Sequence, residues 1–313
     1  MWGYILRRIL ATIPVLLIVA VLVFMMLRLT PGDPAAVIAG DAATAENVAE
    51  IREKLGLDRP IVTQFFIWVG HMLTGDLGES FFYKKNVTEL IADRIEPTVS
   101  LAILTIVLAS AIAVPLGTIA AYRQGSWIDR VVMGFSVLGF SVPVFVIGYV
   151  LIYIFSMQLG WFPVQGYQRL AEGFWGFLHR LILPSLALAV IYVALIARMT
   201  RTSVLEVLNE DYVRTARAKG LPQIKVLMRH ALRNAAVPIV TVIGIGIALL
   251  IGGVVVTESV FAIPGLGSLT VDAVLGRDYP TVQAVIMLFS VVYVVINLVI
   301  DLLYTVLDPR IRY

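Results

Sequence analysis

Long stretches of this chain contain no charged side chain. Residues 131–168 contain no Asp, Glu, Lys or Arg over 38 positions. One bilayer crossing by a helix needs only about 20 apolar residues. Charged residues make up 14% of the chain and hydrophobic residues 59%, whereas soluble proteins are about 25% charged. Most of the chain is therefore expected to lie in lipid, where helices satisfy their own backbone groups.

Six stretches are long and apolar enough to cross a bilayer of about 30 Å. They are residues 9–27, 99–122, 131–157, 181–197, 234–257 and 279–300. The first exceeds the roughly 7 to 15 apolar residues of a signal peptide, which predicts an uncleaved anchor. Ser141 and Pro143 are expected to kink the third stretch. We therefore expect an all-α membrane protein with six transmembrane helices and both termini on one side.

The distribution of charge predicts the orientation. Of the 24 basic residues, 14 lie on the side of the termini and 9 on the other, while the acidic residues divide 5 and 15. Arg28 and Asp301, at the edges of spans, complete the totals. Basic residues favour the cytoplasm, so we expect a multi-pass plasma-membrane protein with cytoplasmic N- and C-termini. The net charge of +3 is too small to indicate nucleic acid as a partner.

The chain divides into three expected segments. Residues 1–29 hold the N-terminus and first span, 30–98 form an extracytoplasmic loop with short helices, and 99–313 form a core of five spans. In the loop, Thr44 is expected to cap a helix that ends near Gly56, and a second short helix is expected over residues 88–95 before Pro97.

The cytoplasmic connection 198–235 is the most informative segment, because two adjacent helices need only about 2 to 8 connecting residues. Eight of the 24 basic residues lie in it. From Ser203 to Ala216, apolar residues recur at three- and four-residue spacing, which predicts an amphipathic helix whose apolar face needs a partner. Gly220 is expected to end it in a left-handed turn, and Pro222 to begin the next segment. A surface helix that touches only lipid phosphates fits the same pattern.

This segment also carries a family resemblance. Its sequence Asp211-Tyr212-Val213-Arg214-Thr215-Ala216-Arg217-Ala218-Lys219-Gly220-Leu221, followed by Arg229-His230-Ala231-Leu232-Arg233-Asn234-Ala235, resembles the cytoplasmic signature of bacterial ABC-importer permeases, in the form of the dipeptide and oligopeptide branch. Similar motifs extend over essentially the whole chain: Pro31-Gly32-Asp33-Pro34, Gly75-Asp76-Leu77-Gly78, Leu159-Gly160-Trp161-Phe162-Pro163, Pro264-Gly265-Leu266-Gly267, Arg277-Asp278-Tyr279-Pro280 and Leu307-Asp308-Pro309.

One departure from the general permease motif is visible. The positions of its opening Glu-Ala-Ala hold Arg214, Thr215 and Ala216, so no coupling role is assigned to a carboxylate there.

The resemblance implies the transmembrane domain of a type I ABC importer in a bacterial inner membrane. The partners it implies are a homologous second permease, two cytoplasmic ABC ATPases, an extracytoplasmic substrate-binding protein and the bilayer. A coupling helix would dock on the ATPase, through Tyr212, Arg214, Ala216, Arg217, Ala218, Lys219, Gly220 and Leu221. Gly220→Pro or Ala216→Glu is then expected to abolish transport. The implied substrate is a di- or oligopeptide or a related solute such as glutathione, with nickel or another small solute as the alternative.

No residue of this chain is expected to be catalytic or to bind a metal or cofactor. The chain contains no G-x-x-x-x-G-K-[ST] motif for nucleotide phosphates. ATP and Mg are therefore expected on the partner ATPases, and this chain is expected not to be an enzyme. The main alternative is an ion-coupled secondary transporter or channel, but its spans should contain ionisable groups, and these spans are nearly bare of them.

The residues expected to line a pathway or gate are Ser141, Pro143, Gly252, Gly253, Glu258 and Asp272. The alternative for Glu258 and Asp272 is a structural role in the loops. The glycines of the fifth span, Gly244, Gly246, Gly252 and Gly253, favour close helix packing over a gate.

Overall fold

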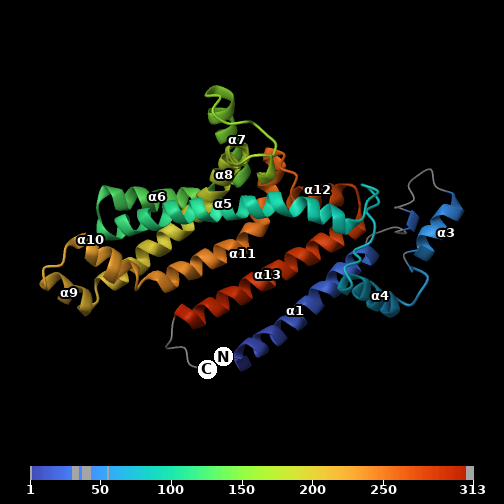
Figure 1. Ribbon diagram of the computed structural model, residues 1–313, viewed down its shortest axis with the longest axis horizontal. Coiled ribbons are helices and arrows are strands. Elements are labelled where there is room, and N and C mark those ends of the chain that lie inside the picture. Colours follow the sequence, from blue (N-terminus) through green and yellow to red (C-terminus); the bar gives the residue numbers. More distant parts are fainter. Residues whose placement is uncertain (1, 30–34, 37–43, 55, 308–313) are drawn as a thin grey trace. The chain divides into compact units, whose positions relative to one another are not determined.

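The computed structural model describes residues 2–29, 35–36, 44–54 and 56–307, which are largely helical (Figure 1). In this part of the chain five helices are long and apolar enough to cross a membrane, or six when one bent pair counts as a single span. The expectation of an all-α protein with six apolar spans is therefore confirmed. The main helices are α1 (Trp2–Leu29), α3 (Ala45–Lys54), α4 (Ile61–Leu73), α5 (Val87–Tyr122), α6 (Trp127–Ser141), α7 (Val144–Leu151), α8 (Phe174–Leu208), α9 (Asp211–Ala218), α10 (Gln223–Lys225), α11 (Ala236–Phe261), α12 (Leu266–Leu275) and α13 (Tyr279–Leu307).

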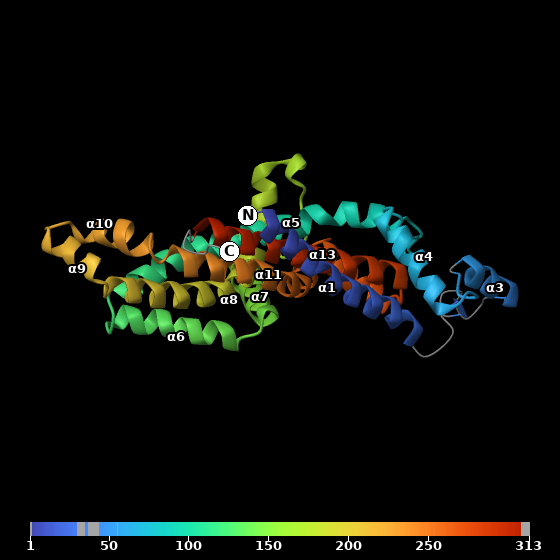
Figure 2. The same cartoon turned by 90° about the horizontal axis from the view of Figure 1, so that it is seen from below.

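The chain forms two compact units. The first comprises Met1–Glu96 with Gly265–Val295, and the second Pro97–Pro264 with Ile296–Tyr313. In the second unit α8 is the central helix, because α6, α7 and α11 all pack against it. Both views show α6 alongside α8, with α9 beyond the end of α8 (Figures 1 and 2). Small residues of α8 such as Ala187 and Ala194 are fully buried, so they let neighbouring helices approach closely.

The first unit is held by aromatic and amide contacts. The ring of Phe24 in α1 lies 5.2 Å from that of Phe65 and 5.7 Å from that of Trp68, both in α4. The amide of Gln283 in α13 donates a hydrogen bond of 3.0 Å to the carbonyl oxygen of Val23. The apolar helix α4 lies in the expected outside loop and was not predicted from the sequence. It packs on α1, which removes part of its apolar surface from water.

The predicted loop helix that starts near Thr44 is confirmed. The prediction of a second, separate short helix in this loop is wrong. The backbone N–H of Asn47 donates to Thr44 Oγ1 at 3.3 Å, so Thr44 caps α3. Residues 88–95 belong instead to the 36-residue α5, which continues through Pro97 and Pro115. A proline removes one helical hydrogen bond, but this loss does not stop a helix whose remaining bonds and apolar contacts continue on both sides.

The third predicted span is broken where the sequence placed a kink. The axes of α6 and the helix beginning at Val144 differ by 106° across Val142 and Pro143. Pro143 stands at the start of α7 because it has no N–H to continue the ladder of α6. The helix then continues as a π-helical segment, Ile152–Gln158. The kink is confirmed, and the expectation of one continuous span over residues 131–157 is corrected to a broken one.

The fourth predicted span and the amphipathic helix after it share one long helix. α8 runs for 35 residues, from Phe174 to Leu208, and is interrupted only then, at Asn209 and Glu210. The single helix expected from Ser203 onward is therefore wrong, because it is divided between the end of α8 and the separate α9. Apolar spacing did not reveal the break, because the buried residues before it (Val204 and Leu208) and after it (Val213 and Ala216) belong to the same apolar cluster.

Candidate functional site

The helix α9 lies within the basic connection of residues 198–235. Glu210 stands before its first residue, and Asp211 lies in the first turn, where a carboxylate favours the positive end of the helix dipole. The Thr215 hydroxyl donates to the carbonyl of Asp211 at 3.0 Å. After Lys219 the backbone turns at Gly220, whose φ is +76°, and the N–H of Gly220 donates to the carbonyl of Arg217 at 2.9 Å. The predicted left-handed turn is therefore confirmed.

One face of α9 is anchored on this chain itself. Val213 is fully buried and Ala216 is 5% exposed. They belong to one apolar cluster with residues from the ends of α5, α8 and the following segment: Ala121, Val204, Leu208, Val226, Ala231, Ala235 and Ile239. Ala216 thus allows α9 to approach its own chain, whereas the sequence suggested close approach to a partner. Leu221 is half-buried at the edge of this cluster.

The opposite face of α9 is open to the surroundings. The exposed residues of α9 and of the turn after it include Tyr212, Arg214, Arg217, Ala218, Lys219 and Gly220. Arg214 Nη1 lies 3.4 Å from Asp211 Oδ1, one turn earlier, and both side chains are well exposed. Such a pair contributes little to stability, about 0.5 kcal/mol at most. This face has a net positive charge, because it carries Arg214, Arg217 and Lys219 and only one acidic residue, Asp211. A positive face suits an acidic partner surface. We call these six exposed residues the outer face of α9.

A partly buried ion pair fixes the helix from which α9 emerges. Arg201 in α8 binds Asp129 in α6 through two nitrogens, and its Nη2 lies 2.7 Å from Asp129 Oδ2. Asp129 is 4% exposed and also accepts the N–H of Gly125 at 2.9 Å. Sequence reasoning missed both residues, because each was counted only toward the charge of its loop. The only indication in the sequence was a single Asp near the start of an apolar helix, two residues after Trp127.

The bend between α6 and α7 holds two of the predicted pathway residues. The exposed Ser141 donates its hydroxyl to the carbonyl of Val137 at 3.0 Å, and Pro143 precedes the first residue of α7. A serine that bonds to the preceding turn often bends a helix, so both residues help to form the bend. Their place in a pathway stays a prediction.

The neighbouring glycines of α11 differ in their surroundings. A Cβ atom on Gly253 would lie 2.8 Å from Leu188 Cδ1, and one on Gly244 would lie 2.7 Å from Ile300 Cγ1. A Cβ atom on Gly252 would meet nothing within 4 Å. Gly244 and Gly253 therefore serve packing within the chain, whereas Gly252 remains open to a gate or a partner.

The two acidic pathway candidates belong to different compact units. Glu258, at the end of α11, is fully buried and accepts the Thr98 hydroxyl at 2.6 Å. The exposed Asp272, in α12, accepts the hydroxyl of Tyr83 at 3.0 Å. Burial, followed by this hydrogen bond, raises the pKa of Tyr83. Both carboxylates thus have structural hydrogen bonds, and their meeting a substrate stays a prediction. Among the described residues no group of three or more His, Asp or Glu residues is placed to hold a metal ion.

Comparisons with known proteins place this geometry in a family. Residues 113–313 match the model of the binding-protein-dependent transport system inner membrane component, and residues 1–102 match the model of its N-terminal region. A probable peptide ABC transporter permease of Sinorhizobium fredii is 54% identical, over 99% of each chain. A putative peptide transport system permease of Brucella abortus and a glutathione transport system permease of Salmonella typhi are each 46% identical over 100% of both chains.

Solved structures agree on the fold. A chain of the MetNI methionine ABC transporter in an inward-facing conformation has a TM-score of 0.58 at 18% identity, over 70% of this chain and 96% of that one. A chain of an amino acid ABC transporter has a TM-score of 0.51 at 17% identity, over 70% of this chain and 94% of that one. With its apolar spans and the family match over most of its length, this chain belongs to the family of binding-protein-dependent transport system inner membrane components.

Proposed function

We propose that this chain is one of two homologous permeases of an ATP-driven importer, and that α9 is the helix through which ATPase subunits drive it. The observation that carries the proposal is the division of α9 into two faces. Val213 and Ala216 fix the helix to its own chain, while Arg214 and Arg217 are left exposed. A helix seated in this way can pass a push or pull to α8 without sliding, because packed side chains are hardly compressible.

Each outer-face residue has a proposed role. Arg214, Arg217 and Lys219 pair with acidic side chains of the ATPase, and Tyr212 supplies a half-apolar ring, a type enriched at interfaces. Ala218 lets the partner approach closely, and Gly220 turns the chain back toward the membrane. Ala216 and Leu221 contact the apolar cluster of this chain and so hold the helix in place.

The cargo proposed for this importer is a di- or oligopeptide or a related solute such as glutathione. Support comes from relatives, whose names state peptide or glutathione transport at 46% to 54% identity over nearly full length. An extracytoplasmic binding protein would deliver the cargo to the side of residues 30–98, and the cargo would pass between the two permeases. ATP and Mg would bind to the two ATPases. This arrangement requires cytoplasmic termini in a multi-pass inner-membrane protein.

The test is uptake by the complete complex in proteoliposomes. This chain is produced with a homologous second permease, ABC ATPases and a substrate-binding protein from the same genome, with tri-alanine and glutathione as labelled probes. We expect uptake that needs ATP inside the vesicles together with the binding protein. Uptake by this chain alone, driven by a proton gradient without ATPases, would instead establish the secondary-transporter alternative.

The role of α9 has its own test. The variant Arg214→Glu with Arg217→Glu reverses the charge of the outer face, so we expect the ATPases no longer to copurify with the permeases. The matched control is Arg169→Glu with Arg180→Glu, which changes the same charge on the expected opposite side of the membrane. Equal copurification by both variants would contradict the assignment of α9.

A further inference from the structure

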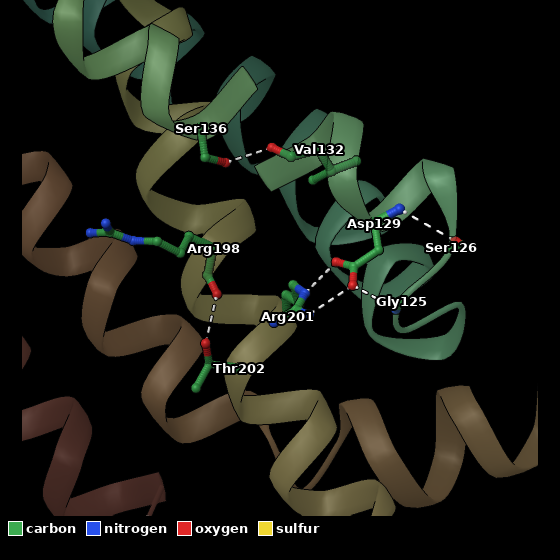
Figure 3. A network of polar contacts seen from close by, with 8 residues as sticks. All are labelled: Gly125, Ser126, Asp129, Val132, Ser136, Arg198, Arg201 and Thr202. Carbon is green, nitrogen blue, oxygen red and sulfur yellow. Dashed lines mark hydrogen bonds and ion pairs between the residues drawn. The ribbon is translucent and has the colours of Figure 1, made fainter. Parts of the chain in front are cut away.

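The ion pair of Asp129 and Arg201 joins two helices close to the point where α8 ends (Figure 3). The guanidinium of Arg201 approaches both carboxylate oxygens, and the N–H of Gly125 donates to the same group. The backbone N–H of Asp129 in turn donates to Ser126 Oγ at 3.4 Å, which caps α6. Arg198, one turn earlier in α8, points away from this carboxylate. The pair thus fixes the first turn of α6, and the turn before it, to one face of α8.

A third helix is in contact at the same level. A Cβ atom on Gly117 of α5 would lie 2.5 Å from the carbonyl oxygen of Ala197 and 3.1 Å from the backbone nitrogen of Arg201. The backbones of α5 and α8 therefore touch beside the ion pair, which leaves no room for them to shift past each other. The end of α5 also contributes Ala121 to the apolar cluster that seats Val213 of α9.

The two ends of α6 have different surroundings. Its first turn is tied to Arg201, seven residues before the end of α8 and ten before α9 begins. Its last residue, Ser141, borders the 106° bend to α7. α7 packs against α11, and a Cβ atom on Gly148 would lie 3.3 Å from the ring of Phe261. A displacement of the end of α8 therefore has a contiguous physical route through α6 to this bend.

A buried ion pair is weak evidence of a stabilising role, since apolar side chains of similar volume often stabilise as well. What the pair supplies is direction, because a guanidinium binds a carboxylate in a planar, two-pronged geometry that Lys cannot reproduce. Such a contact resists rotation of α6 relative to α8 as well as separation.

We propose that Asp129 and Arg201 are positioning residues for transport: they make α6 move with α8 when an ATPase displaces α9, so that the movement reaches the bend between α6 and α7. This inference rests on the proposed function of α9. Neither residue contacts the ATPase or the cargo. The permease with the pair disrupted still assembles with its ATPases, and ATP hydrolysis no longer drives uptake efficiently.

The experiment compares variants of the complete importer in proteoliposomes, with labelled tri-alanine and glutathione as probes. Asp129→Asn and Arg201→Gln are expected to lower uptake per ATP hydrolysed about tenfold, within the range of measured coupling between distant sites. Arg201→Lys keeps the charge without the two-pronged geometry, so its ratio is expected to fall between those of Arg201→Gln and the unaltered complex. The matched control is Arg130→Gln, which removes the same charge from an exposed position of α6 beside Asp129 and should leave the ratio unchanged.

Assembly and thermal unfolding of each complex are measured alongside. If Asp129→Asn lowers only the Tm or the amount of assembled complex and leaves uptake per ATP hydrolysed unchanged, the positioning role is overturned. Equal loss in Arg130→Gln and Arg201→Gln would overturn it as well. If the unaltered complex itself shows no ATP-driven uptake, the proposed function fails and this inference with it. Normal ATP-driven uptake by the unaltered complex and by Asp129→Asn removes this inference alone.

Discussion

Two parts of the chain differ in whether their polar side chains lie in the interior or on the surface. Around the start of α13, the fully buried Asp278 accepts the Ser80 hydroxyl at 2.5 Å, the backbone N–H of Phe81 at 3.2 Å and the Thr281 hydroxyl at 2.7 Å. In α9 the arrangement is reversed, with Val213 buried and the charged side chains outside. We call the first group the Asp278 network.

The difference separates a structural contact from a binding surface. Polar groups in the interior must find their hydrogen-bond partners within the chain, and the Asp278 network does so between residues almost 200 positions apart. Charges on the outer face of α9 gain little from one another in water, so they remain available to a partner. Removing a buried polar group should therefore reduce the stability of the chain, whereas removing an exposed charge of α9 should reduce association with the ATPase.

The sharpest test of this difference is a pair of identical substitutions within α9. Ala216→Glu places an unpaired charge in the apolar cluster and is expected to lower the free energy of unfolding by about 3 kcal/mol or more, with loss of transport. Ala218→Glu places the same charge on the outer face and should leave unfolding unchanged while weakening ATPase copurification. Thermal unfolding in detergent and copurification measure the two effects. Equal unfolding of both variants would contradict the two-faced description of α9.

The Asp278 network should respond in the opposite way. Asp278→Ala leaves the N–H of Phe81 and two hydroxyls without their acceptor, which is expected to cost about 2 kcal/mol of stability. ATPase copurification by the folded fraction should be unchanged. Asp278→Asn keeps one acceptor oxygen and should cost less. A loss of copurification without a change in thermal unfolding would show that this network is not merely structural.

Adjacent glycines in α11 extend the comparison to a single helix. Gly253→Ala pushes against Leu188 and is expected to cost about 1 kcal/mol of stability, since overpacking forces side chains to shift. Gly252→Ala meets nothing within 4 Å and should leave unfolding of this chain unchanged. Uptake assays on the same variants then test the gate. Lower uptake by Gly252→Ala at normal stability supports a gate or partner contact at Gly252, and normal uptake removes it from the candidates.

The smallest expected effect on stability belongs to the exposed pair in α9. Arg214→Gln breaks the contact with Asp211 and should change the free energy of unfolding by less than about 0.5 kcal/mol. ATPase association by this variant should nevertheless be weaker and less sensitive to salt, because one screened charge pair is lost. Copurification over a series of salt concentrations measures this. A salt dependence identical to that of the unaltered protein would place Arg214 outside the interface.

Much of the fold could be predicted from local sequence. Apolar length identified the regions of the spans, Thr44 the start of α3, and Gly220 the left-handed turn, because each depends on the residue itself or on close neighbours. Pro143 identified the bend but not its size, since 106° is set by what α6 and α7 pack against. The break between α8 and α9 was missed because neither Asn209 nor Glu210 interrupts the apolar periodicity.

The long apolar stretches were enough to predict a helical membrane protein, and the motifs indicated the family of permeases. Which side of α9 faces its own chain depends on contacts between helices, and these contacts bury Ala216, which was expected at the interface. Tertiary structure alone also brought Asp129 to Arg201, 72 residues away, and Ser80 to Asp278. The physical reason is that periodicity depends on neighbours along one helix, whereas a buried charge is matched by whichever helix packs beside it.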